Sequence, residues 1–524
     1  MVCRRRFALT IFTVWVALAV RASSAQQPPP APVDLARLEA AIDQARQEWG
    51  VPGLSVAIVK DGQVVLAKGY GVRELGKPEL VDADTLFAIA SNTKAFTAAA
   101  LAMLEEEQKL AWRDRVQQYL PWLQLYDPYV SADLRLDDLL CHRTGLKTFS
   151  GDLLWWGTAY TPEQMLRRMR YLQPIGPFRA QYGYSNLMYV AAGEVIAAAS
   201  GLPWDRFVSE RILKPVGMAR TLTSVRGLDD AGNFASPHKT TAEAVTPMGW
   251  TNWDNMAAAG GLISSANDMA RWLRVQLDRG RLDDAGRLFS EASSRRMWSP
   301  QTIVPLSDEF RQRYPGTHFR TYGLGWMLSD YRGRLCAAHG GGYDGMVSYV
   351  LLVPDEQLGI VVLTNSLAPL PVPIAHRIRD EYLGGDSRDW FGEGLADHRR
   401  RQAEFDERIR QAITPAAEGT RPSRDLEAYA GTFSCSLYGD ATVSVEGDKL
   451  VLRLLPNEQL VADLTHLHYD TWVIRWRQTF AWFAEGTAQF VPDARGDFRQ
   501  LKLHVPNDDL WFDELQLKSA ESHP

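Results

Sequence analysis

The stretch Ser91–Leu104, which reads SNTKAFTAAALAML, decides the fold. Almost every residue after Lys94 is apolar or small, and such a run favours a buried helix. In a helix that begins at Ser91, the side chains of Ser91 and Lys94 lie one above the other, because residues three apart share a face. The sequence therefore predicts a serine hydroxyl beside a lysine amine at the N-terminus of a core helix.

This pair has a chemical use. A serine hydroxyl is a poor nucleophile until a base removes its proton. Burial lowers the pKa of a lysine, so its neutral amine can act as that base. Free backbone N–H groups at a helix N-terminus also favour developing negative charge.

The spacing alone is not specific. S-x-x-K occurs a second time at Ser236–Lys239, within a proline-containing, loop-like region. An ordinary helix cap with a solvated lysine is the alternative interpretation of Ser91 and Lys94. Further strings are needed to choose between the two.

The second string is Tyr184-Ser185-Asn186, the only Y-x-N in the chain. It precedes an apolar run, Leu187–Ala192, which is typical of another core helix. At this place Tyr184, as tyrosine or tyrosinate, could relay a proton to a leaving group, and Asn186 could hydrogen-bond substrate. A buried tyrosine and a turn asparagine are the alternative.

The third string, His339-Gly340-Gly341-Gly342, comes just before a predicted strand at Val347–Val353. Glycines beside a strand allow a substrate to approach the backbone closely. The N–H of Gly342 and that of Ser91 could then form an oxyanion hole. The alternative is a glycine-rich hairpin turn with a surface histidine.

In this order the three strings resemble the serine β-lactamase and penicillin-binding protein superfamily, over residues 34–385. The resemblance is to class C β-lactamases and their related esterases and D-amino-acid peptidases, in which Y-x-N replaces S-D-N. It implies acylation of Ser91 by a carbonyl substrate, then deacylation, without a metal or a cofactor. It assigns acid/base work to Lys94 and Tyr184. Substrate binding falls to Asn186, His339, Gly341 and Gly342. Neighbouring segments that share the resemblance are Leu139–Leu146, Ala259–Leu273 and Tyr322–Trp326.

The chain departs from this family at the third motif, because no K-T-G is present and His339-Gly340-Gly341 stands in its place. A lysine in a cleft is cationic and can hold a substrate carboxylate. A histidine, with an ordinary pKa near ~6.5, is mostly neutral at pH 7. We therefore expect esters, amides or D-amino-acid peptides as substrates rather than β-lactams, with His339 as a possible proton carrier.

The arrangement of predicted elements indicates an α+β fold of the β-lactamase/transpeptidase type. A helix at 35–49 and a hairpin at 54–67 begin the catalytic domain, and strands at 347–363 with a helix at 372–382 complete it. One antiparallel sheet is thus built from both ends, around a mainly helical insertion of about 90–330. Residues 386–423 follow as a charged helix and linker. Residues 424–517 form a small all-β domain that resembles the lipocalin-like appendage of some family members.

The N-terminus is typical of a cleaved signal peptide at 1–25. Arg4–Arg6 precede an apolar stretch, Phe7–Val20, and Ser23-Ser24-Ala25 supplies small residues for cleavage. Residues 26–33 form a Pro-rich leader. We expect a periplasmic or secreted protein, with a retained membrane anchor as the alternative. Cys141, Cys336 and Cys435 remain after cleavage; we expect mostly buried thiols, with one disulfide as the other option.

The net charge and the motifs that the sequence lacks argue against other classes of protein. The net charge is −6, from 57 basic and 63 acidic residues, which argues against a nucleic-acid partner. G-x-S-x-G, H-E-x-x-H, C-x-x-C and Walker motifs are missing from the sequence. The prediction is an exported serine hydrolase that acts on a small-molecule or peptide substrate. The alternatives are a β-lactamase or DD-peptidase proper, and a non-catalytic penicillin-binding sensor of the cell wall.

Overall fold

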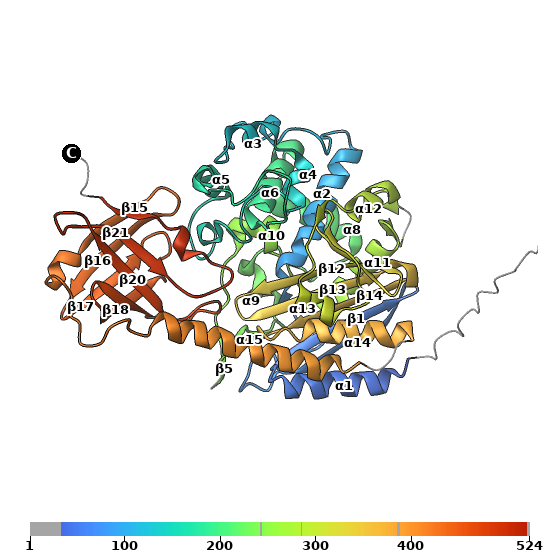
Figure 1. Cartoon of the computed structure of the whole chain (residues 1–524). Coiled ribbons are helices and arrows are strands. Elements are labelled where there is room, and N and C mark those ends of the chain that lie inside the picture. Colours follow the sequence, from blue (N-terminus) through green and yellow to red (C-terminus); the bar gives the residue numbers. More distant parts are fainter. Residues whose placement is uncertain (1–32, 242–243, 284–285, 385–387, 521–524) are drawn as a thin grey trace, which may run out of the picture.

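The computed structural model describes residues 33–241, 244–283, 286–384 and 388–520. The predicted signal peptide and nearly all of the Pro-rich leader lie outside these residues. The described chain forms a larger domain of sheet and helices and a smaller β-barrel, and the long helix α15 (Trp390–Ala412) runs from one to the other (Figure 1).

The larger domain is organised around an antiparallel sheet of eight strands in the order β2-β1-β14-β13-β12-β11-β10-β9. The first and last strands of the domain are neighbours, since Leu54 of β1 lies opposite Thr364 of β14. This confirms the predicted sheet built from both ends of the domain. In chain order the strands are β1 (Gly53–Lys60), β2 (Gln63–Gly71), β9 (Thr302–Ile303), β10 (Arg320–Tyr322), β11 (Met327–Tyr331), β12 (Arg334–Tyr343), β13 (Met346–Val353) and β14 (Leu358–Thr364).

The predicted C-terminal boundary of the helical insertion was wrong. Strands β9, β10 and β11, at 302–331, belong to the sheet, although the sequence placed them in the insertion. These strands are only two to five residues long, too short to show a clear alternation of apolar and polar residues.

Helices cover both faces of the sheet (Figure 1). Helices α1 (Leu35–Glu48) and α14 (Pro371–Leu383) pack on one face, with Val56 and Ile58 of β1 in the core between them. Ala57 and Val59 of the same strand enter the core on the other face, with α2 (Thr93–Glu106) and α11 (Ala266–Leu277). Because alternate residues of β1 meet two separate cores, the strand is apolar from Val56 to Val59 without a break.

The insertion holds the remaining helices, and α2 is its centre. Every residue of α2 from Thr93 to Leu104 is buried, as the run of small and apolar residues predicts. The other helices are α3 (Pro128–Asp133), α4 (Leu136–Leu140), α5 (Pro162–Arg168), α6 (Asn186–Ser200), α7 (Trp204–Val208), α8 (Lys214–Val216), α9 (Leu228–Ala231), α10 (Ala257–Gly260), α12 (Glu291–Met297) and α13 (Asp308–Arg313). Short strand pairs are β3 (Phe87–Ala88) with β6 (Ile263–Ser264), β4 (His238–Thr240) with β5 (Val245–Pro247), and β7 (Arg281–Leu282) with β8 (Gly286–Arg287).

In the described part of the chain, no single helix has the length and apolar composition needed to cross a bilayer, whereas the sharply bent pair 186–200 and 204–216 passes on those two criteria. Cys141, Cys336 and Cys435 are buried, unpaired thiols, so the option of a disulfide among them was wrong.

The C-terminal strands close into an eight-stranded barrel in which each strand pairs with the next. The predicted fold class, an α+β domain plus a small all-β C-terminal domain, is confirmed. The barrel strands are β15 (Gly431–Cys435), β16 (Gly439–Glu446), β17 (Lys449–Leu454), β18 (Val461–His468), β19 (Thr471–Trp476), β20 (Gly486–Pro492), β21 (Phe498–His504) and β22 (Leu517–Ser519).

Candidate active site

Ser91 lies in a single 3₁₀ turn, Ala90–Asn92, just before α2, so the α-helix begins two residues later than the sequence suggested. Ala90 has a φ of +45°, a left-handed conformation that residues other than glycine rarely adopt. Such strained residues concentrate at functional sites. The turn brings Ser91 to the wall of a largely apolar cleft.

Lys94 is fully buried and lies directly behind Ser91. Its Nζ is 3.0 Å from Ser91 Oγ, 2.7 Å from Asn186 Oδ1 and 2.8 Å from the carbonyl oxygen of Ala259. Burial lowers the pKa of Lys94 well below its ordinary value. A neutral amine has two hydrogens, and the amide and carbonyl oxygens can accept both. Its lone pair is then left to face the Ser91 hydroxyl.

Asn186 connects Lys94 to a carboxyl group that the sequence did not predict. Asn186 is the first residue of α6, whose N-terminus Ser185 caps by accepting from Met188 N–H. Its Nδ2 donates to Asp152 Oδ2 over 2.7 Å. Burial raises the pKa of Asp152 to about 8. No spacing in the sequence relates Asp152 to the other motifs, because it follows an irregular turn 34 residues before Asn186.

Tyr184 reaches the same serine from the other side. Its hydroxyl is hydrogen-bonded to the Ser91 side chain, and burial raises its pKa well above 10. Tyr184 is therefore a neutral phenol in the resting protein, which removes the tyrosinate option. His142, from the family-like segment Leu139–Leu146, holds this tyrosine: its Nδ1 accepts from Ser185 N–H over 3.1 Å and its ring centre is 4.1 Å from that of Tyr184.

His339 lies within strand β12, not in a hairpin turn. Its Nδ1–H donates to the Gly340 carbonyl over 2.6 Å, and its Nε2 accepts from Tyr322 O–H over 2.8 Å. Burial and the nearby Lys94 lower the pKa of His339 to about 3. With both nitrogens occupied and no charge at neutral pH, the side chain is poorly suited to hold a carboxylate or carry a proton.

The three glycines after His339 face different neighbours, because alternate residues of a strand point to opposite faces. Gly340 and Gly342 line the cleft. Gly341 does not; a Cβ built on it would lie 2.3 Å from the Ile89 carbonyl oxygen and 2.4 Å from Ser348 Oγ. The structure thus places Gly341 where the strand passes the turn that carries Ser91, and Gly342 beside the reacting centre.

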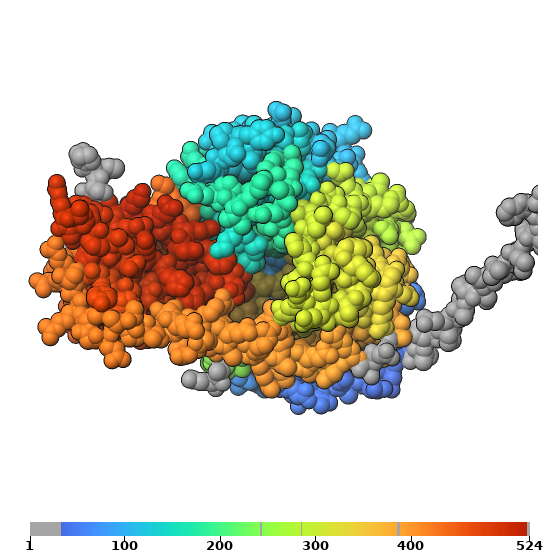
Figure 2. Space-filling model, in the orientation of Figure 1, coloured from blue at the N-terminus to red at the C-terminus, as the bar shows by residue number. Residues whose placement is uncertain are grey.

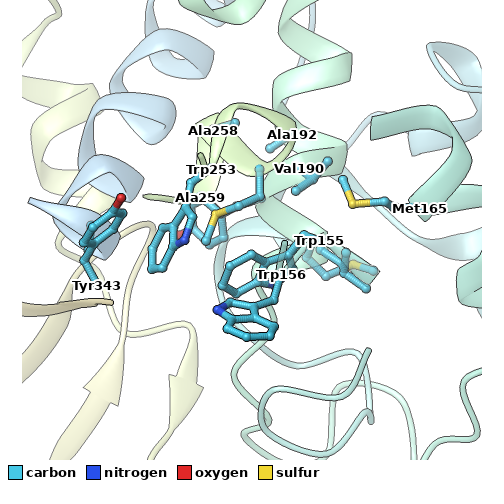
Figure 3. Close-up of a cluster of buried hydrophobic side chains, with 14 of the residues drawn as sticks. Trp155, Trp156, Met165, Val190, Ala192, Trp253, Ala258, Ala259 and Tyr343 are labelled. Atoms are coloured by element: carbon cyan, nitrogen blue, oxygen red, sulfur yellow. The ribbon is translucent and has the colours of Figure 1, made fainter. Parts of the chain in front are cut away.

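The cleft has a volume of about 460 Å³ and is largely aromatic. Trp155 and Trp253 meet edge to face, with ring centres 4.9 Å apart, and Figure 3 shows them gathered with Trp156 and Tyr343. Trp250 packs on Tyr343, with ring centres 5.2 Å apart. In Figure 2 the surface is hollowed where the red barrel meets the green and yellow parts of the larger domain. Lining residues are Ser91, Phe149, Asp152, Trp155, Tyr182, Tyr184, Asn186, Trp253, Met256, Arg320, Tyr322, Met327, Ala338, His339, Gly340, Gly342, Tyr349, Trp482, Asp509 and Leu510.

The second S-x-x-K string is not part of this site. Ser236 Oγ donates to Glu74 over 2.6 Å, and Lys239 Nζ donates to the Phe480 carbonyl. Across residues 33–241, 244–283, 286–384 and 388–520, no three His, Cys, Asp or Glu side chains are grouped to hold a metal ion.

Known proteins with similar sequences show the family of this chain. The family model described as Beta-lactamase matches residues 38–383, and a domain of unknown function, DUF3471, matches 415–519. Unguisins hydrolase ungD' of Aspergillus campestris (strain IBT 28561) is 28% identical over 78% of this chain and 78% of its own. Penicillin-binding protein 4 of Amycolatopsis lactamdurans is 27% identical over 64% of this chain and 86% of its own.

A solved structure has a similar fold, that of the octameric penicillin-binding protein homologue from Pyrococcus abyssi. It aligns with a TM-score of 0.61 at 23% identity, over 93% of this chain and 100% of its own. The chain therefore belongs to the beta-lactamase family, within the serine hydrolase superfamily that includes the serine β-lactamases and penicillin-binding proteins.

Proposed function

We propose that this protein is an exported serine hydrolase that forms an acyl-enzyme on Ser91. The observation that carries the proposal is the buried Lys94 amine 3.0 Å from Ser91 Oγ, with its pKa well below the ordinary value. A neutral amine at this distance can take the hydroxyl proton as the oxygen attacks a carbonyl.

The other groups complete the cycle. As Ser91 Oγ bonds to the carbonyl carbon, its proton passes to Lys94 and negative charge develops on the carbonyl oxygen. The N–H groups of Ser91 and Gly342 are the candidate donors to that oxygen. Tyr184, hydrogen-bonded to Ser91, relays the proton to the leaving alcohol or amine as the carbonyl–leaving-group bond breaks. Water then attacks the acyl carbon and passes a proton through the same groups to Ser91 Oγ, as the bond between that oxygen and the acyl carbon breaks and the acid leaves.

The substrate class that we propose is an ester, an amide or a D-amino-acid peptide. A neutral His339 in place of the family's lysine supports this class over β-lactams. A relative named as a hydrolase and another named as a penicillin-binding protein are compatible with carbonyl substrates. The signal-like residues 1–25 support export to the periplasm or the medium.

The test is a substrate panel of short-chain nitrophenyl esters, D-alanyl peptides and a chromogenic cephalosporin, together with mass spectrometry after a fluorophosphonate probe. We expect ester or peptide turnover and a covalent adduct on Ser91, both lost in Ser91→Ala. Ser236→Ala, in the other S-x-x-K string, is the matched control and should keep both. Turnover of the cephalosporin alone would favour a β-lactamase, stable penicillin labelling without turnover a sensor, and no labelling of Ser91 would sink the proposal.

A further inference from the structure

The barrel meets the catalytic domain with one of its two ends. In a barrel whose strands each pair with the next, alternate loops lie at the same end. The loops β15–β16, β17–β18, β19–β20 and β21–β22 therefore share an end, and all four contact the catalytic domain. The contacts are Tyr160 O–H to the Tyr438 carbonyl (2.6 Å), Asn457 Nδ2 to the Trp156 carbonyl (3.2 Å), the rings of Trp156 and Phe480 (5.3 Å) and Trp511 Nε1 to the Thr148 carbonyl (2.8 Å).

Two of these loops supply part of the cleft wall. Trp482, from the β19–β20 loop, lies over Gly342, where an added Cβ would be 3.1 Å from its ring. Asp509 and Leu510, from the β21–β22 loop, also line the cleft. The catalytic domain alone would thus leave one side of its own cleft open.

The β21–β22 loop is built to hold its shape. Buried Asn507 accepts from the backbone N–H groups of Asp509 (3.0 Å) and Leu510 (2.5 Å), and its Nδ2 donates to the carbonyls of Val505 and Leu510. Farther along, Glu514 accepts from Ser150 Oγ (2.5 Å) and from Gly151 N–H (2.8 Å), next to Asp152. Asp509 is therefore held in place relative to the catalytic groups.

The carboxyl group of Asp509 has no hydrogen-bonding or ion-pair partner within the described residues. This holds although Arg320 also lines the cleft. Burial, and then the charge of Asp508, raise the pKa of Asp509 to about 6, and its charge in turn helps to raise the pKa of Asp152. An unpaired carboxylate in an aromatic cleft is unfavourable, and such groups in native proteins call for a functional explanation.

We propose that the barrel is the substrate-selecting domain and that Asp509 binds the free α-ammonium group of an aminoacyl substrate. This inference rests on the hydrolase proposed above and names its substrate class. The ammonium would bring the missing positive charge and a charge-assisted hydrogen bond. Trp482 and Leu510 would bound the space beyond it, so that blocked amino termini fit poorly.

The experiment compares alanine p-nitroanilides of both configurations with their N-acetyl counterparts. Turnover is measured with the wild-type protein, and binding by calorimetry with Ser91→Ala, which cannot form the acyl-enzyme. We expect the free amine of one configuration to be favoured by about 10- to 100-fold in kcat/KM and in affinity. Asp509→Asn should abolish that preference in both measurements.

Asp508→Asn is the matched control. It makes the same change one residue away, where the carboxylate pairs with Arg408 and is exposed, outside the cleft. It should keep the preference, and the thermal midpoints of both variants report folding. Three results would each overturn the proposal: Asp509→Asn preferring the free amine as strongly as the wild type does, no preference for the free amine in the wild type, or no binding of either compound. Selective binding of the free amine without turnover would support the role of Asp509 and contradict the proposed hydrolase activity. Turnover without selectivity for the free amine would support the hydrolase activity and contradict the role of Asp509.

Discussion

Substituting Gly341 with alanine tests whether β12 positions the nucleophile. The new Cβ would meet the Ile89 carbonyl oxygen at 2.3 Å and Ser348 Oγ at 2.4 Å. An ordinary contact begins at 3.4 Å, so the strand or the turn must move by about 1 Å. We expect the turn to move, because Ala90 already has a strained backbone. Ile89 and Ala90 immediately precede Ser91, so this movement would displace Ser91.

The magnitude follows from that displacement. Misplacing a reacting group by about 1 Å costs on the order of 100-fold in rate, equivalent to about 2.7 kcal/mol of transition-state stabilisation. Overpacking a tight interior costs about 1–3 kcal/mol of folding free energy. We therefore expect Gly341→Ala to be folded, less stable and roughly 100-fold less active on whichever substrate the panel identifies.

The assay is kcat/KM together with urea unfolding, and the neighbouring glycine supplies the control. A Cβ on Gly340 would find only the Tyr349 ring, at 3.8 Å, so Gly340→Ala should keep the wild-type free energy of unfolding. Wild-type activity and stability in Gly341→Ala would refute the reasoning, because the turn would then tolerate the displacement.

Three further predictions concern ionisable groups. Lys94→Met removes the base without leaving an unpaired charge, and should lower kcat by about 10²- to 10⁴-fold while the protein stays folded; near-normal turnover would exclude Lys94 as the base. The pKa of His339 is about 3 in the folded protein and near 6.5 in the unfolded chain. Between these pH values only the unfolded state binds the proton, so the stability contributed by neutral His339 is lost as pH falls from about 6.5 to 3. Urea unfolding across that range should show the wild type losing stability relative to His339→Gln; parallel curves would contradict the assignment. Asp152 has the opposite sign, since its folded pKa of about 8 exceeds the unfolded 3.8, so the folded state alone keeps the proton and stability falls as pH rises from about 4 to 8. Asp152→Asn should therefore gain stability relative to the wild type over that range in thermal melts, and a constant difference would count against it.

Short-range patterns were sufficient to predict which side chains gather around Ser91. Ser91 and Lys94 are three residues apart, and Tyr184 and Asn186 lie on either side of the N-cap of a single helix, so each pair is positioned by local backbone geometry. The sheet could also be predicted, because β1, β13 and β14 are long enough to show apolar runs between turns.

The environment of those groups could not be predicted in the same way. The carbonyl of Ala259 that accepts from Lys94 is 165 residues away, and Asp152 lies in a turn with no periodic neighbours. The low pKa of His339 depends on burial and on Tyr322, which only the folded sheet brings together. The glycines of β12 left a hairpin turn open as the alternative, because glycine disfavours strands, and the sequence could not show that Gly341 passes close to the main chain at Ile89.

Strand β12 carries constraints from both domains. Gly341 faces the turn before Ser91, where main-chain and Ser348 atoms leave no room for a Cβ. Gly342 faces the cleft, and its nearest neighbour is the ring of Trp482 from the barrel. A side chain can shift more easily than a main-chain turn, so we expect the first constraint to hold the proposed nucleophile in place and the second to affect what enters the cleft. On the proposed mechanism, the groups around Ser91 can therefore stay fixed while the barrel loops change, which would let one acylation site serve different substrates.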